Sequence, residues 1–309
     1  MLENNPVISF ILINYNSDVF LNNIVREIIT KVHKVLFEIV VFENCSTEQQ
    51  DFSEIEKIGQ VRLIKSFKNL GFGRGCNEAV QHAKGDYFIF INPDTEIVNL
   101  DLIYLLELIR NKEIGVLGIQ HVDSTNSRVI SVRPFCGVRQ ALFELFWLNR
   151  LVDWFNSKRI DFSVRNRGYA EVDFVSGAFM LIRKPVFKEM NGFDPFYFMY
   201  VEEADFAWRL KKSGYKNIFV PSQVIRHFQG KSVKNYIFEL ENNHRNQIYF
   251  VFKFRGLVSA ILFTCIQSLN KAIRGIVYLL FGLLSDSVQN KKKGFAFLQV
   301  AKIYWWSKK

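Results

Sequence analysis

The feature that most constrains the fold is an alternation of short apolar runs with segments of helical periodicity. Apolar residues recur at helical spacing within Phe20–Val32, and helices are also predicted over Gly73–Ala83 and Leu100–Asn111. Between them lie five predicted strands: Val7–Asn14, Phe37–Phe42, Val61–Lys65, Tyr87–Ile91 and Val116–Gln120. This order predicts an α/β fold with a mostly parallel central sheet flanked by helices.

Composition narrows the class of protein. Hydrophobic residues make up 49% of the 309 residues, enough for a sizeable core. The four cysteines, which form no C-x-x-C pair, argue against a zinc ribbon or disulfide scaffold and fit a reducing compartment. The N-terminus has no basic region before its apolar run, so we expect a first strand there and not a signal peptide.

The positive charge is concentrated at the C-terminus. From Lys253 to Lys309, ten Lys and Arg residues face one acid, Asp286, so this region carries +9 of the net +10. Its apolar runs, Gly256–Leu269 and Gly275–Val288, are each about 14 residues long, short of the roughly 20 that span a bilayer. Basic residues between apolar runs, with aromatic residues at 304–306, predict helices on an anionic membrane surface and no nucleic-acid binding.

Two alternatives stay open for this region: a true membrane span, or a helical subdomain that packs on the body or on a second copy in a homo-oligomer.

We predict a domain over 1–235, with a nucleotide-binding half to about 125 and an acceptor half from 126, followed by a basic helical region, 236–309. Residues 134–168 are expected to be irregular, as a flexible lid or an acceptor-side segment. The later elements are predicted strands at Val172–Val175, Phe179–Ile182, Ile218–Val220 and Val224–Arg226, and helices at Glu202–Lys212 and Tyr236–Phe254.

Polar residues follow several of the predicted strands. Asn14 and Tyr15 end the first strand, Glu43 ends the second, and Asp94 follows the strand in FIFINPDTEI. The C-terminal edge of an open α/β sheet is where ligands bind. At that edge the Tyr15 ring and the Glu43 carboxylate are suited to bind a nucleobase, and the Asp94 carboxylate is suited to bind a divalent cation. The alternative at each position is a structural role in a turn or a helix cap.

Three further motifs are candidates for binding or catalysis. NLGFGRGCNEA (69–79) carries three glycines before a helix start and is neither a P-loop nor a dinucleotide fingerprint, so it predicts a diphosphate neighbour or a tight turn. In FYFMYVEEADFAWRL, aromatic surroundings favour a general base at Glu202 or Glu203, whereas Asp205 and Arg209 have the spacing of a surface salt bridge. His227 in VIRHFQG is either a metal ligand or a structural histidine.

Taken in series over about residues 6–255, these motifs resemble family 2 glycosyltransferases with the GT-A fold, most closely the rhamnosyltransferase-like branch. Besides the stretches above, the resemblance covers SFILINYNS, VVFENCST and VSGAFMLIRKPVFKEMNGFD.

The resemblance implies a role for each matching residue. Glu43 takes the position that binds the nucleobase. Asp94 takes the last position of a D-x-D-like motif that binds Mn²⁺ or Mg²⁺ and the donor diphosphate, with His227 completing the metal site. Glu203 takes the position of the catalytic base, with Glu202 beside it. The remaining donor-side residues are Asn14, Tyr15, Asn69, Gly71, Arg74, Asn77 and Asn92, and the acceptor or sugar side comprises Gly177, Ala178 and Asp205.

Glu43 and Glu203 each replace the aspartate usual in the family, so their carboxylates reach further by one methylene. We expect the backbone to compensate, with Glu202 or Asp205 as alternative bases. The resemblance implies an inverting transfer of a sugar, first of all rhamnose from dTDP-rhamnose, as in O-antigen and cell-envelope polysaccharide biosynthesis. The basic C-terminal region suggests the acceptor, a polyprenyl-diphosphate-linked glycan at the cytoplasmic face of the membrane. The alternatives are a UDP-hexose or UDP-galactofuranose donor, and a degenerate protein that binds nucleotide or glycan without catalysis.

Overall fold

The computed structural model describes residues 7–228 and 236–302. The chain divides into two compact units. The first, the catalytic unit, comprises 1–135, 160–198 and 202–232; the second, the helical unit, comprises 136–159, 199–201 and 233–309. The predicted boundary at 235 lies outside the described residues, and the division into domains stays a prediction.

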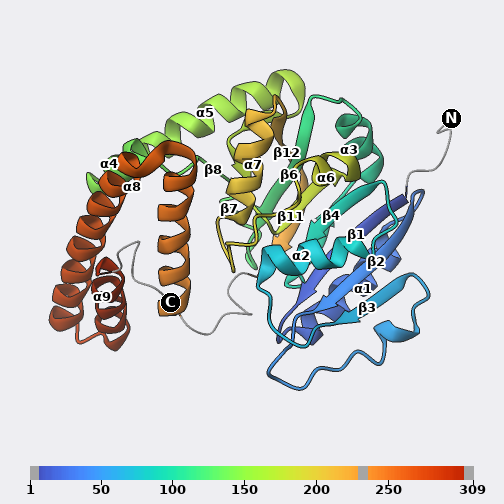
Figure 1. The fold of residues 1–309 in the computed structure, drawn as a ribbon, viewed down its shortest axis with the longest axis horizontal. Coiled ribbons are helices and arrows are strands. Elements are labelled where there is room, and N and C mark those ends of the chain that lie inside the picture. The colour runs from blue at the N-terminus through green and yellow to red at the C-terminus, as the bar shows by residue number, and fades with distance from the viewer. Residues whose placement is uncertain (1–6, 229–235, 303–309) are drawn as a thin grey trace. The chain divides into compact units, whose positions relative to one another are not determined.

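The first half of the catalytic unit is a parallel sheet, as the alternation predicted (Figure 1). Strand β1 pairs in parallel with β2 on one side and β4 on the other, and β2 pairs in parallel with β3. These elements are β1 (Val7–Asn14), α1 (Asp18–Lys31), β2 (Leu36–Glu43), η1 (Ile55–Lys57), β3 (Val61–Lys65), α2 (Phe72–Gln81) and β4 (Tyr87–Ile91).

The second half of the sheet is mixed. Strand β11 lies antiparallel between β4 and β6, while β12 runs parallel to β6 and antiparallel to β5, giving the order β3-β2-β1-β4-β11-β6-β12-β5. The elements are β5 (Thr95–Asn99), α3 (Leu102–Ile109), β6 (Ile114–Val122), β7 (Arg128–Val129), β8 (Val132–Arg133), β9 (Ala170–Val172), β10 (Phe174–Val175), β11 (Phe179–Arg183), α6 (Lys184–Glu189), α7 (Glu202–Lys212) and β12 (Lys216–His227).

Several details differ from the sequence prediction, and three of them concern strands of the main sheet. Strand β5 begins two residues after Pro93, and the sequence analysis missed it. The two strands predicted at 218–220 and 224–226 are one strand, β12, whose register against β6 shifts between Val220 and Val224. The strand predicted at 172–175 is two, because β9 pairs with β12 and β10 with β8.

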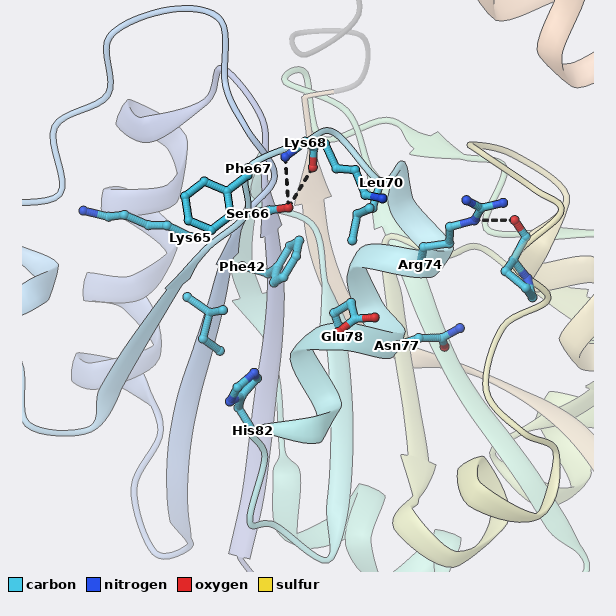
Figure 2. Close-up of a pocket in the computed structure, with 12 residues that line it drawn as sticks. Phe42, Lys65, Ser66, Phe67, Lys68, Leu70, Arg74, Asn77, Glu78 and His82 are labelled. Carbon is cyan, nitrogen blue, oxygen red and sulfur yellow. Dashed lines mark hydrogen bonds between the residues drawn. The ribbon is translucent and has the colours of Figure 1, made fainter. Parts of the chain in front are cut away.

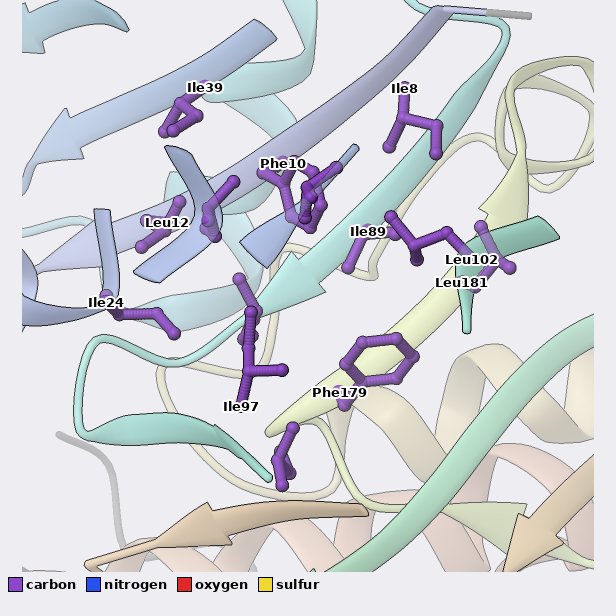
Figure 3. Close-up of a cluster of buried hydrophobic side chains, with 14 of the residues drawn as sticks. Ile8, Phe10, Leu12, Ile24, Ile39, Ile89, Ile97, Leu102, Phe179 and Leu181 are labelled. Atoms are coloured by element: carbon purple, nitrogen blue, oxygen red, sulfur yellow. The ribbon is translucent and has the colours of Figure 1, made fainter. Parts of the chain in front are cut away.

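The central strands β1, β4 and β6 are buried on both faces, which is why they read as continuous apolar runs. Alternate residues of β1 point to opposite sides, so Ile8, Phe10 and Leu12 join the core under α1 and α3. Figure 3 shows this core, with Ile24 of α1 and Leu102 of α3 closing over the strands. Ile11 and Ile13 face the opposite core, which is rich in phenylalanine and is covered by α2, α6 and α7.

The expectation that residues 134–168 are irregular was wrong, whereas their role as a lid or an acceptor-side segment stays a prediction. That segment forms α4 (Val138–Leu145) and α5 (Asn149–Arg167), whose residues up to 159 belong to this unit. The sequence shows no helical periodicity there because α5 buries none of its residues, so its apolar side chains are not confined to one buried face.

The basic region after residue 235 is helical within the described residues, up to 302. It forms α8 (Tyr236–Leu284) and α9 (Val288–Ala301), and α8 is broken at Gly256, whose φ of 82° no L-residue adopts easily. Helices α8 and α9 pack closely: a Cβ atom on Gly294 would lie 2.9 Å from the carbonyl oxygen of Gly275. In the described part of the chain, α8 is the one helix long and apolar enough to cross a membrane.

Candidate active site

The tips of β1 and β2 hold a buried carboxylate in place. Asn14 and Glu43 are partners in the parallel register, and the Asn14 side chain donates to Oε2 of Glu43 at 2.5 Å. The backbone N–H of Ser46 donates to Oε1 at 2.6 Å. Tyr15 follows, half-buried, at the same edge. Glu43 is therefore a fixed acceptor at the edge where the sequence predicted the nucleobase.

The glycine loop is shaped by contacts within the protein. The Asn44 side chain donates to the carbonyl oxygen of Gly71 at 3.1 Å and accepts from the backbone N–H of Leu70 at 2.8 Å, while Asn69 accepts from the N–H of Gly71 at 2.9 Å. Gly71 has a φ of +77°, and a Cβ atom there would lie 1.9 Å from the carbonyl oxygen of Phe198. Glycine is therefore required at position 71 because the backbone of Phe198 lies too close for any side chain.

Arg74 and Asn77, predicted on the donor side, connect α2 to the loop after α6. The Asn77 side chain donates to the carbonyl oxygen of Phe193 at 2.7 Å and accepts from its N–H at 2.9 Å. Nε of Arg74 donates to the carbonyl oxygen of Pro195. Both residues also line a surface cavity of about 710 Å³, with Lys65, Lys68 and Phe67 across from them (Figure 2). The carboxylates of Glu43, Asp94 and Glu203 do not line this cavity, so it is separate from the candidate catalytic centre.

The antiparallel pairing of β5 with β12 brings the two predicted metal ligands together. His227 is the register partner of Thr95, and its Nε2 lies 3.3 Å from Oδ1 of Asp94. The side-chain nitrogen of Asn92 lies 3.5 Å from the same Nε2, and the backbone N–H of Asn92 donates to the carbonyl oxygen of Ala178 at 3.2 Å. A chain of contacts therefore joins Ala178, Asn92, His227 and Asp94.

These residues fit a divalent cation with an incomplete protein shell. Within residues 7–228 and 236–302, no three His, Cys, Asp or Glu side chains are grouped to hold a metal ion. A carboxylate oxygen and an imidazole nitrogen nevertheless converge at Asp94 and His227. Mg²⁺ sites commonly combine one or two carboxylates with water and substrate phosphates, so a two-ligand site suits a cation that arrives with a diphosphate.

Glu202 and Glu203 open α7 but have different surroundings. Glu202 is buried, and a Cβ atom on Gly73 of α2 would lie 3.4 Å from its Cβ. Burial, together with the Glu203 carboxylate, raises the pKa of Glu202 well above its usual value. Glu203 is half-buried, and a Cβ atom added to Gly177 would lie 4.0 Å from the Cβ atom of Glu203. Of the two carboxylates, Glu203 is therefore the one more accessible to an acceptor.

Asp205 is bound within the protein, and its pair with Arg209 is not a surface pair. The Asp205 side chain is 0% exposed; it accepts from Nε of Arg209 at 2.6 Å and from the Tyr197 hydroxyl at 3.2 Å. The same guanidinium donates to the carbonyl oxygens of Met190 and Gly192. An i,i+4 spacing looks identical on a surface and in a core, so the sequence could not place this pair.

The sequence analysis singled out neither Asn44 nor Ser46, which fix the glycine loop and Glu43. Their only signal was their position just after a strand tip, which is equally typical of turns. His121 was also missed: it is buried, with its ring centroid 5.8 Å from that of His227. Burial, with a smaller contribution from His227, lowers the pKa of His121 to about 3, so this neighbour stays neutral.

Comparison with known proteins identifies the family. Residues 5–248 match the family described as "Glycosyltransferase like family 2". An N-acetylglucosaminyl-diphospho-decaprenol L-rhamnosyltransferase from Mycobacterium tuberculosis (strain ATCC 25618 / H37Rv) is 28% identical over 211 residues, covering 63% of this chain and 67% of the relative. The rhamnosyltransferase WbbL from Escherichia coli (strain K12) is 31% identical over 163 residues, covering 49% of this chain and 58% of the relative.

Solved structures share the fold at lower identity. The mannosyltransferase PcManGT from Pyrobaculum calidifontis, in complex with GDP-Man and Mn²⁺, aligns with a TM-score of 0.62 and 14% identity, over 99% of this chain and 89% of that one. GalNAc-T7, with UDP, GalNAc and Mn²⁺, aligns with a TM-score of 0.60 and 16% identity, over 81% of this chain and 48% of that one. The fold of the chain is therefore GT-A, as the sequence motifs predicted.

Proposed function

This chain belongs to the family 2 glycosyltransferases, in the rhamnosyltransferase-like branch, and we propose that it transfers a sugar by inversion from a nucleotide donor to a lipid-linked glycan. The first candidate for the donor is dTDP-rhamnose, with UDP-hexose and UDP-galactofuranose as alternatives. The observation that carries the proposal is the convergence of Asp94 and His227, 3.3 Å apart and joined through Asn92 to Ala178.

The donor binds at the tips of β1 and β2. The buried carboxylate of Glu43, fixed by Asn14 and Ser46, accepts a hydrogen bond from a base N–H, and Tyr15 offers a ring for stacking. Because the carboxylate is held on both oxygens, it is preorganised and loses little freedom when the nucleotide binds.

The donor diphosphate lies toward Asp94. Asp94 and His227 would hold a divalent cation, which when bound neutralises charge on the departing diphosphate. The Mn²⁺ in the solved structures of PcManGT and GalNAc-T7 supports this assignment. Asn92 lies at the same place: its side-chain nitrogen is 3.5 Å from Nε2 of His227, the nitrogen that faces Asp94.

Glu203 acts as the general base. It accepts the proton of the acceptor hydroxyl while that oxygen bonds to the anomeric carbon and the bond from this carbon to the diphosphate oxygen breaks. The nucleoside diphosphate leaves with the bonding electron pair, and one displacement inverts the anomeric centre. Glycine at position 177 leaves room beside the Glu203 side chain.

The acceptor is a polyprenyl-diphosphate-linked glycan, and the helical unit holds the protein at the cytoplasmic membrane surface through residues 253–309. The net charge of +9 in this region and the apolar character of α8 support the assignment. The M. tuberculosis relative, an N-acetylglucosaminyl-diphospho-decaprenol L-rhamnosyltransferase, supports it as well.

The test is release of nucleoside diphosphate from a panel of dTDP-, UDP- and GDP-sugars, with and without Mn²⁺ or Mg²⁺. Slow hydrolysis of the donor needs no acceptor, so the panel also identifies the sugar. We expect metal-dependent release from one donor, lost in Asp94→Ala and Glu203→Gln. The matched controls are Asp161→Ala and Glu107→Gln, exposed positions outside the site, which should keep full release.

Release that survives both site substitutions would overturn the assignment of the site. Binding of a donor without release, even when polyprenyl-diphosphate glycans are supplied, would favour the degenerate binder over the transferase.

A further inference from the structure

The helical unit carries an exposed aromatic segment between α4 and α5, which we define as residues 146–155. Within ten residues it exposes six large apolar side chains: Phe146, Trp147, Leu148, Leu151, Trp154 and Phe155. Trp147 is 59% exposed and Trp154 is 52% exposed. Contiguous apolar surface of this kind marks an interaction site in soluble proteins.

The backbone of Trp147 adds an independent observation. Its φ is 60°, in the left-handed region that favours glycine or asparagine at a helix end. The chain there closes α4, since the N–H of Leu148 donates to the carbonyl oxygen of Phe143 at 2.8 Å. A tryptophan at this position is strained and gains little burial in return, so packing within the described residues does not account for its side chain.

The surroundings of the segment favour lipid as its partner. Within seven residues of the segment or inside it lie four basic residues, Arg139, Arg150, Lys158 and Arg159, and three acids, Glu144, Asp153 and Asp161, so the basic residues are in slight excess and would attract anionic headgroups. Tryptophan and phenylalanine with basic neighbours are typical of the membrane interface. In the described part of the chain, 22 of the 29 exposed large apolar side chains belong to the helical unit, so this surface is a property of that unit.

The segment also belongs structurally with α8, the helix apolar enough to enter a membrane. Helix α4 packs on α8, and the Gln267 side chain donates to Oε2 of Glu144 at 2.8 Å. We propose that residues 146–155 form a second membrane-docking element, in addition to the element assigned to 253–309. This second element inserts Trp147 and Trp154 into the interface of an anionic bilayer. This inference extends the membrane association in the proposed function and rests on it.

The test uses the full chain with Trp208, Trp305 and Trp306 changed to Phe, so that Trp147 and Trp154 are the remaining fluorophores; positions 305 and 306 lie outside the described residues. The probe is a vesicle of phosphatidylcholine and phosphatidylglycerol, with or without brominated phosphatidylcholine. We expect a blue shift on binding and quenching by the brominated lipid. Sedimentation of the wild-type protein with the same vesicles, measured in parallel, reports the membrane association itself.

Substitution separates a docking role from a structural one. Trp147→Asn with Trp154→Ser should weaken vesicle binding by roughly tenfold or more, because two interfacial aromatic rings are lost. The urea midpoint should stay equal or rise, because asparagine tolerates the left-handed conformation at 147. Phe67→Ser, at a fully exposed aromatic in the catalytic unit, is the control and should leave vesicle binding unchanged.

Three results would overturn the inference. If the protein sediments with vesicles but Trp147 and Trp154 are not quenched, the segment does not insert, and the assignment of 253–309 survives. If the double variant turns a dimer into a monomer with unchanged vesicle binding, the segment covers a second copy. If nothing sediments, the membrane association in the proposed function fails as well.

Discussion

The Nε2 atom of His227 lies 3.3 Å from Oδ1 of Asp94, although one residue follows β4 and the other ends β12. The β5–β12 ladder creates this proximity: its last register pair joins Thr95 to His227, and the N–H of Phe228 donates to the carbonyl oxygen of Asp94 at 3.0 Å. The pair is therefore held by backbone pairing and does not depend on a flexible loop.

The first prediction concerns metal affinity. Asp94→Asn should lower metal-dependent donor hydrolysis by roughly 100-fold, because the carboxylate charge that holds the cation is lost. His227→Ala should weaken Mn²⁺ binding by about tenfold or more, since a nitrogen ligand is removed. Titration of Mn²⁺ in the presence of the nucleoside diphosphate measures the affinity, with Asp161→Ala as control. Hydrolysis that persists in excess chelator would contradict the metal site.

The second prediction tests the glycine loop. Gly71→Ala should cost more than about 1–2 kcal/mol of unfolding free energy, because alanine is disfavoured at a φ of +77° and its Cβ would meet the carbonyl oxygen of Phe198. Gly59→Ala is the matched control: φ there is not positive and a Cβ atom would have no other atom within 4 Å, so a gain of about 0.4–1 kcal/mol is expected. Urea unfolding measures both, and equal midpoints would mean that the loop adapts freely.

The third prediction concerns the buried pair of Asp205 and Arg209. Arg209→Met should cost about 3–5 kcal/mol, because the Asp205 charge stays buried without its guanidinium. Adding Asp205→Leu should recover part of the loss, but not all, since the carbonyl oxygens of Met190 and Gly192 still lack the donor that Arg209 supplied. Urea unfolding of both variants measures the difference. If Arg209→Met unfolds like the wild type, the pair contributes nothing to stability.

Much of the catalytic unit could be predicted because its signals are local. Strand β1 and helix α7 occupy the predicted residues, and the parallel register brings Asn14 opposite Glu43 as strand order implies. The pattern works there because β1, β4 and β6 are buried on both faces and the covering helices on one.

The rest depended on tertiary structure. Helix α5 exposes its apolar residues, so periodicity gave no signal, and the register shift at Val220–Val224 made one strand read as two. The burial of Asp205 comes from Tyr197 and the loop at 190–192, which no i,i+4 spacing reveals. The contact of His227 with Asp94 requires β5. The sequence analysis missed this strand because Pro93, two residues before it, indicated a turn.

The last prediction separates the two carboxylates of α7 by pH. The pKa of Glu202 is raised above its ordinary 4.5 by burial and by Glu203, so the folded protein keeps a proton that the unfolded chain releases as pH rises past 4.5. Its contribution to stability is therefore fully present below pH 4.5 and is lost as pH rises toward the folded pKa. Glu202→Gln cannot ionise, so its stability relative to the wild type should increase from pH 4.5 towards neutral in urea unfolding.

Activity should depend on the other carboxylate. Glu203→Gln should lower donor turnover by about 10²–10⁴-fold, the usual loss for a general base, whereas Glu202→Gln should stay within about tenfold because the glutamine amide resembles a protonated carboxyl. Glu203→Gln should also lower the pKa of Glu202, since it removes a neighbouring charge, and so flatten the decline of stability with pH. If Glu202→Gln is the inactive variant and Glu203→Gln remains active, the two residues have exchanged the roles assigned here.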